Sequence, residues 1–188
     1  MIVYLHGFNS SPKSAKAQYL KRHLEERGEG EKFACPWLPH RPNQAIVAAE
    51  AEIARRPKQE ITLIGSSLGG FYATWLAESH SMRAVLVNPA IEPHADLRAY
   101  LGPQQPYHGG TPYELTEQHL IEWQKLFLAK VNPERYLLLV ETGDEVLDYR
   151  HAVRKYAGAK QVVVQGGDHG FTSFAAQVPL ILAFAGMA

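Results

Sequence analysis

The stretch from Ile61 to Leu76 constrains the fold of this chain more than any other. It begins with a short apolar run typical of a buried strand and ends in residues typical of a helix. Between them lies Gly65–Gly69 (GSSLG), which matches the pattern G-x-S-x-G with Ser67 at its centre. A serine on so tight a turn has a strained backbone, and the glycines leave room for the chain to reverse. We predict a strand, a sharp turn and a helix, with Ser67 as a nucleophile lifted clear of the sheet.

Two nucleotide-binding motifs that also place glycines between a strand and a helix do not fit this turn. A phosphate-binding loop, G-x-x-x-x-G-K-[ST], needs a lysine that is absent here. The dinucleotide-binding fingerprint fails because Ser67 occupies the place of its second glycine. The remaining alternative is a purely structural turn between a buried strand and a buried helix.

Short apolar runs alternate with helical segments along the whole chain. The expected strands are 2–5, 32–37, 61–64, 83–87, 135–141 and 161–165, and the expected helices are 14–27, 42–56, 68–80, 116–130, 148–157 and 171–184. Such alternation favours a parallel sheet covered on both faces. A length of 188 residues suits one domain. We therefore predict a single α/β domain, 1–188, with a six-stranded, mostly parallel sheet and helices on both faces.

Residues 90–132 lack a strand pattern and are rich in proline and glycine. The segment is too long for an ordinary connection, so we predict a small helical cap inserted after the fourth strand. Its aromatic residues are candidates to line an acyl pocket, with packing inside the cap as the alternative for each: Tyr100, Tyr107, Tyr113 and Trp123.

The loop after the first strand contains His6, Gly7 and Phe8. Chemistry in open parallel sheets gathers beyond the carboxyl ends of the strands. In serine hydrolases an early loop supplies one amide of the oxyanion hole, and the residue after the nucleophile supplies the other. We predict that the Phe8 and Leu68 amides form this hole. For His6 we favour a structural role within its own loop over a catalytic one.

Two aspartates after the fifth strand compete for the role of triad acid. Asp144 lies in the turn next to the strand, whereas Asp148 directly precedes a helix and is explained as its N-cap. We therefore favour Asp144, which would accept a hydrogen bond from the imidazole of the base. We expect Glu145 to face solvent.

The base is predicted in the turn after the last strand. The chain contains nine histidines, but only His169 follows a late strand after both the serine and an acid. Its flanking small residues would let the ring enter a crowded site. This gives the chain order Ser, Asp, His. We expect a structural role for Asp168.

Charge and composition exclude several kinds of partner. Lys and Arg total 19, as do Asp and Glu, so no net field attracts nucleic acid or an anionic membrane. The single cysteine, Cys35, can form neither an internal disulfide nor a thiolate zinc site, and the histidines lack metal-ligand spacing. Neither the short apolar start nor the apolar tail suits a signal peptide or a span. We expect a cytoplasmic protein without metal or cofactor.

Taken together, these motifs resemble the α/β-hydrolase superfamily, and within it the small bacterial esterases of the YqiA type. The resemblance covers nearly the whole chain and rests on five stretches: 4–12, 65–75, 87–90, 142–149 and the Gly-Gly-x-His of 166–169. It implies a compact hydrolase in which Ser67, Asp144 and His169 match the triad positions. It also implies hydrolysis of short carboxylic esters or acyl thioesters.

The sequence thus predicts a serine esterase that acts on a small-molecule ester through a covalent acyl-enzyme. One alternative is an acyl thioesterase with the same machinery, in which Lys13 and Lys16 near the first loop could meet a phosphate. Another is a binding protein that keeps the fold without turnover.

Overall fold

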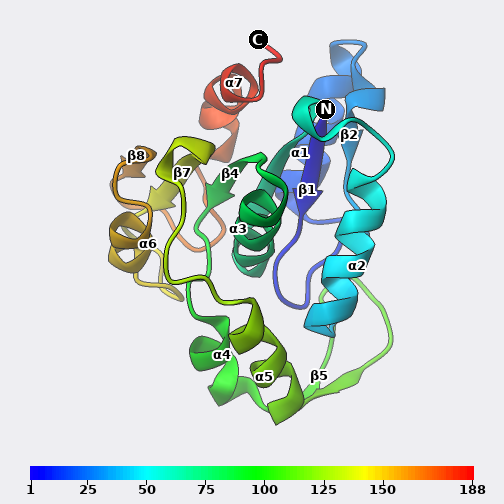
Figure 1. The fold of residues 1–188 in the computed structure, drawn as a ribbon, viewed down its shortest axis with the longest axis vertical. Coiled ribbons are helices and arrows are strands. Elements are labelled where there is room, and N and C mark those ends of the chain that lie inside the picture. The colour runs from blue at the N-terminus through cyan, green and yellow to red at the C-terminus, as the bar shows by residue number, and fades with distance from the viewer.

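Six parallel strands form the central sheet of the computed structural model, which describes residues 1–188 (Figure 1). They are β1 (Ile2–Leu5), β2 (Phe33–Ala34), β3 (Thr62–Ser66), β4 (Arg83–Val87), β7 (Tyr136–Glu141) and β8 (Lys160–Val164). The spatial order is β2-β1-β3-β4-β7-β8, and every neighbouring pair is parallel. The predicted six-stranded parallel sheet is confirmed.

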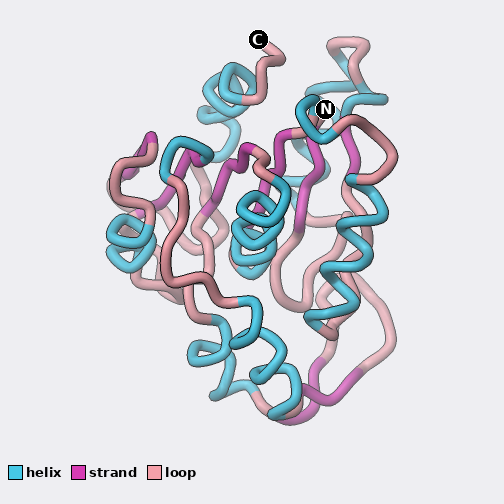
Figure 2. The backbone as a smooth tube through the Cα atoms, viewed as in Figure 1, coloured by secondary structure: helices cyan, strands magenta, loops and turns pink.

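Helices cover both faces of this sheet (Figure 2). The covering helices are α1 (Ala15–Glu26), α2 (Pro42–Ile53), α3 (Leu68–His80), α6 (Tyr149–Lys155) and α7 (Phe174–Phe184). Single 3₁₀ turns lie at Gly30–Lys32, Lys58–Glu60 and Pro133–Arg135. Two hydrophobic clusters result, one containing α1 and α7, the other α2, α3 and α6. Strand β1 serves both, because its side chains alternate: Val3 and Leu5 join one cluster, Ile2 and Tyr4 the other. This explains why the central strands are continuously apolar.

The segment between β4 and β7 lies beyond the edge of the sheet farthest from both termini (Figure 1). It contains α4 (Pro93–Asp96), a 3₁₀ turn (Leu97–Tyr100), the antiparallel pair β5 (Gly102–Gln104) and β6 (Tyr113–Leu115), and α5 (Glu117–Leu126). The expectation of a purely helical, strandless segment was therefore wrong. Each strand has three residues, too few for an alternating pattern, and Pro103 is tolerated because a two-stranded ribbon consists of edges.

Two further boundaries differ from the sequence prediction. The second strand shrinks to two residues, Phe33–Ala34. Helix α7 begins at Phe174, not at 171, because Phe171 has a positive φ of 58° and the next two amides donate to a carboxylate on another strand. No helix of the protein combines the length and apolarity needed to cross a bilayer.

Candidate active site

Ser67 lies between β3 and α3 with φ 53° and ψ −123°, a conformation that costs a non-glycine residue about 1–3 kcal/mol. Backbone hydrogen bonds hold it there. Its amide donates to Val87 O (3.0 Å), and its carbonyl accepts from Gly70 N (2.8 Å) and Ala90 N (3.0 Å). The neighbouring strand β4 therefore fixes the turn that the sequence predicts around Ser67.

Glycine is required at both ends of the motif by close approach of the backbone. A side chain at Gly65 would collide with the Gly69 carbonyl, and one at Gly69 would collide with the Leu5 carbonyl. Helix α3 can thus begin directly against β3 and β1. The same spacing brings the start of α3 beside the loop that follows β1.

The structure brings Ser67, His169 and Asp144 together in one line of hydrogen bonds. His169 Nε2 lies 3.0 Å from Ser67 Oγ, and Nδ1 lies 2.9 Å from Asp144 Oδ2. The Asp144 side chain is 2 % exposed, and its Oδ1 also accepts from the amides of Val146 and Leu147. An ionised carboxylate only accepts, so Nδ1 carries the proton and Nε2 is free to accept from the serine. This is the tautomer that a general base needs.

Asp148 does not contact His169. Its carboxylate accepts from Arg150 N (3.0 Å) at the start of α6 and pairs with the Arg150 guanidinium (2.7 Å). Hydrogen bonds from Arg150 lower the pKa of Asp148 to about 2. The N-cap interpretation of Asp148 is confirmed.

Phe8 and Leu68 both line the cavity that contains Ser67. Neither amide donates to another group of the protein. For Leu68 this follows from its place as the first residue of α3, where the helix offers no acceptor. A Cβ at Gly7 would lie 3.2 Å from Ser67 Cβ, so the absence of a side chain there lets the β1 loop approach the serine. Two residues that line the cavity therefore have unpaired amides, and the oxyanion hole stays a prediction.

His6 is buried and holds its own loop, as the sequence suggested. Its Nε2 accepts from Leu38 N (3.1 Å), so Nδ1 carries the proton and donates to Gly7 O (3.1 Å). Both bonds require the neutral ring. Burial lowers the pKa of His6 from 6.5 to about 4.

This shift makes the stability of the fold depend on pH. As the pH falls below about 6.5, the unfolded chain binds a proton at position 6 and the folded chain does not until about pH 4. The contribution of neutral His6 to the free energy of unfolding is therefore fully present above pH 6.5, and it falls by roughly 3 kcal/mol by pH 4. Denaturant unfolding of wild type and His6→Gln across this range tests the effect, because glutamine keeps an acceptor for Leu38 N but does not titrate. Equal pH slopes for both proteins would contradict it.

Glu141, the last residue of β7, holds the loop that carries His169. This fully buried carboxylate accepts from Asp168 N (2.9 Å), Thr172 N (3.1 Å) and Ser173 N (2.9 Å). Burial by itself would raise the pKa of Glu141, but these hydrogen bonds lower it below its usual value. The ionised carboxylate thus fixes the backbone on both sides of His169.

Two more side chains complete this support. Asn88 donates to the carbonyls of Asp168 (3.0 Å) and His169 (3.3 Å) and accepts from Glu141 N (3.0 Å). Glu145 is exposed as expected, yet it accepts from His169 N (2.9 Å). Sequence reasoning missed all three supporting roles. The one available signal was a carboxylate ending an otherwise apolar strand, at Glu141.

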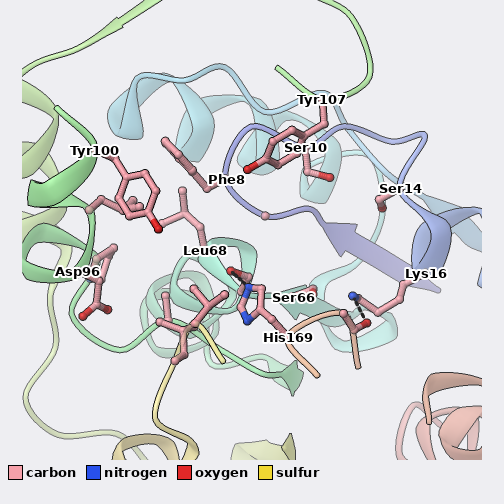
Figure 3. Close-up of a pocket in the computed structure, with 18 of the residues that line it drawn as sticks. Phe8, Ser10, Ser14, Lys16, Ser66, Leu68, Asp96, Tyr100, Tyr107 and His169 are labelled. Atoms are coloured by element: carbon pink, nitrogen blue, oxygen red, sulfur yellow. Dashed lines mark hydrogen bonds between the residues drawn. The ribbon is translucent and has the colours of Figure 1, made fainter. Parts of the chain in front are cut away.

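Ser67 and His169 open into a cavity of about 560 Å³ (Figure 3). Its walls differ in character. Most of the lining is apolar: Phe8, Leu68, Ala90, Pro93, Leu97, Tyr100, Val146 and Leu147. Figure 3 shows Phe8, Leu68 and Tyr100 at the end towards the segment 90–132, together with the carboxylate of Asp96. At the opposite end Figure 3 shows Ser14 and Lys16 of the α1 region. Tyr107 also borders the cavity and is 73 % exposed.

Trp123 does not border this cavity, so its predicted place in an acyl pocket was wrong. The side chain is fully buried, and its Nε1 donates to the Tyr72 hydroxyl (2.8 Å) on α3. The core satisfies both the apolar ring and its single donor. Tyr113 is also directed elsewhere, donating to Asn9 Oδ1 (2.7 Å).

Solved structures with low sequence identity share the fold. Mouse α/β hydrolase domain-containing protein 10 is 13% identical, with a TM-score of 0.74 over 97% of this chain and 87% of that one. Est1E from Butyrivibrio proteoclasticus, solved with ferulic acid bound, is 14% identical, with a TM-score of 0.70 over 98% and 89%. The esterase domain of a Rhodothermus marinus protein is 21% identical, with a TM-score of 0.67 over 98% and 85%.

These likenesses show an α/β-hydrolase fold. The relationship at the level of sequence is narrower. Residues 1–186 match the model of an uncharacterised protein family, UPF0227. With a nearly complete match, this chain of α/β-hydrolase fold belongs to the family UPF0227.

Proposed function

We propose that the protein is a serine esterase that hydrolyses short-chain carboxylic esters. The observation that carries the proposal is the unbroken line Asp144–His169–Ser67, which ends in an open cavity that Phe8 and Leu68 also line. Acyl transfer needs each of these parts: a nucleophile, an oriented base and donors for a negative oxygen. The esterases among the proteins of similar fold support the same reaction class.

In the proposed mechanism each group has one task. His169 Nε2 takes the Ser67 proton as Oγ attacks the acyl carbonyl, and the Phe8 and Leu68 amides donate to the resulting oxyanion. His169 then gives this proton to the leaving alcohol oxygen as the C–O bond breaks. Water, deprotonated by His169, attacks the acyl-enzyme and releases the acid and free Ser67. Asp144 stabilises the imidazolium in both halves.

The preference for short acyl groups rests on the size and lining of the cavity. A volume of about 560 Å³ suits a small ligand, and its apolar wall next to Ser67 suits an alkyl chain. Tyr100 lines this wall, and its ring lies edge-on to Phe8 with centroids 6.2 Å apart. These side chains give the proposed acyl group an apolar surface near Asp96 (Figure 3).

The decisive experiment combines turnover with labelling. Wild-type protein is assayed with p-nitrophenyl esters from acetate to palmitate, with matched acyl thioesters and with anilides. An organophosphonate is added in parallel, and mass spectrometry locates the adduct, which we expect on Ser67. Greater kcat/KM for thioesters than for matched esters would assign the thioesterase instead. If the protein showed no turnover and formed no adduct, the result would favour a binding protein that keeps the hydrolase fold.

Replacing the large side chains that line the cavity with alanine is expected to alter the preference of the protein for acyl groups of different length. Tyr100→Ala and Tyr107→Ala open the cavity, so kcat/KM for octanoate relative to butanoate should rise roughly tenfold, as a few extra methylene contacts allow. Tyr19→Ala serves as the matched control, because Tyr19 lies on α1 outside the cavity. An unchanged ratio in both cavity variants would mean that these rings do not limit the acyl site.

A further inference from the structure

Lys16 presents a cation to the cavity at the end away from the apolar wall (Figure 3). Its Nζ donates to Gly170 O (2.7 Å), the carbonyl directly after His169 in the chain. It forms no salt bridge. An ammonium has three donors, so two remain after the bond to Gly170. The lysine therefore brings an unpaired charge and free donors next to the reacting groups.

Burial lowers the pKa of Lys16, and the carboxylates of Asp168, Glu141 and Asp144, in that order of strength, partly offset this effect. None of them forms a salt bridge with Lys16: Glu141 holds the His169 loop and Asp144 accepts from His169, while Asp168 Oδ1 is buried without a hydrogen-bond partner. A charge that is largely removed from water without an ion-pair partner is unfavourable. An anion entering the cavity would supply that partner.

Neutral donors also line the cavity. Ser14 borders it near Lys16 and Ser10 borders it beside Tyr107 (Figure 3), and the buried Ser14 Oγ faces the Tyr4 hydroxyl. Ser14 precedes α1, but its side chain makes no capping bond to the helix. The ammonium and the two serine hydroxyls that line one cavity are a donor set that suits a carboxylate or phosphate oxygen.

The position of Lys16 also indicates which part of the substrate it meets. His169 must protonate the leaving oxygen, so the alcohol part of an ester lies against His169. Lys16 donates to the next residue, Gly170, whereas Phe8, Leu68 and Tyr100 lie on the other side of His169 (Figure 3). We propose that Lys16, Ser10 and Ser14 form an anion subsite for the leaving group, making the substrate an acyl ester of an alcohol that carries a carboxylate or phosphate. This inference rests on the proposed esterase function.

The test uses pairs of butanoyl esters in which the alcohol part of one partner is anionic and that of the other is neutral. The alcohols are glycolate, 3-hydroxypropanoate and 4-hydroxybutanoate, each compared with its neutral amide, and 2-hydroxyethyl phosphate compared with ethylene glycol. The quantity measured is the ratio of kcat/KM for the anionic ester to that for its neutral partner. For the wild type we expect a ratio above one for at least one pair. A preference confined to the phosphate arm or the carboxylate arm identifies the anion.

Variants of Lys16 then test whether this residue causes the preference for anionic esters. Lys16→Met should lower it roughly 10- to 100-fold, the usual effect of losing hydrogen bonds to a charged group, and Lys16→Arg should restore most of it. Lys13→Met is the control: Lys13 is exposed three residues earlier and outside the cavity, so the ratio should not change.

Three results would overturn the subsite. One is a wild-type ratio at or below one for every pair. Another is an unchanged ratio in Lys16→Met. The third is an equal loss of anionic and neutral hydrolysis in that variant, which would mean that Lys16 only anchors the loop through Gly170. Failure of the wild type to hydrolyse any ester is a separate result, because it rejects the esterase function and the subsite with it.

Discussion

Replacing Ser67 with alanine is expected to lower kcat for p-nitrophenyl butyrate by up to about 10⁶-fold, the loss seen when a triad serine is removed. Without Oγ no acyl-enzyme can form. The fold should persist, because the backbone bonds of residue 67 do not involve the side chain. Steady-state kinetics and a thermal melt of the same preparation measure the two effects.

Covalent labelling distinguishes Ser67 from Ser66, which is its immediate neighbour and also borders the cavity. The organophosphonate adduct should be absent from Ser67→Ala and present in the wild type. An adduct on Ser66 of the wild type, or turnover that survives in Ser67→Ala, would show that another group is the nucleophile.

Replacing Asp144 with asparagine is expected to lower kcat by about 10⁴-fold, by analogy with the loss of a triad carboxylate. Asparagine keeps an oxygen for the amides of Val146 and Leu147, so the turn should remain folded. Its amide group can donate to His169 Nδ1, which favours the tautomer with the proton on Nε2. That tautomer cannot accept the Ser67 proton. The measurement is chromogenic-ester kinetics beside a thermal melt close to that of the wild type.

Asp148→Ala is the matched control for this prediction. Asp148 caps α6 and pairs with Arg150 on the surface, so its loss should reduce thermal stability slightly and leave kcat near the wild-type value. The reverse pattern, an inactive Asp148 variant beside an active Asp144 variant, would place the triad acid four residues later in the chain.

The positions of Ser67, Asp144 and His169 could be predicted because each depends on local sequence. Parallel strands place their carboxyl ends at one edge, so residues that follow β3, β7 and β8 meet there regardless of their separation in the chain. The glycines around Ser67 record a steric requirement of the turn itself. The structure brings the three side chains into hydrogen-bond contact, and the variants test their roles.

Glu141, Asn88 and Trp123 could not be assigned in this way. The hydrogen bonds of Glu141 reach a loop that begins 27 residues later, and no local pattern specifies the partners of a buried carboxylate. The indole of Trp123 fits the amphipathic helix α5 equally well whether it faces a pocket or the core. The β5–β6 ribbon was missed because two three-residue strands carry too little periodicity to be recognised.

The bond from Trp123 to Tyr72 has a consequence for engineering the protein. It connects α5 to the helix that begins directly after Ser67, so the segment 90–132 and the turn that carries Ser67 share one set of packed side chains. A chimera that replaces residues 90–132 with the corresponding segment of a homologue would leave the Tyr72 hydroxyl facing a foreign residue. Such grafts therefore need positions 72 and 123 to be transferred as a pair.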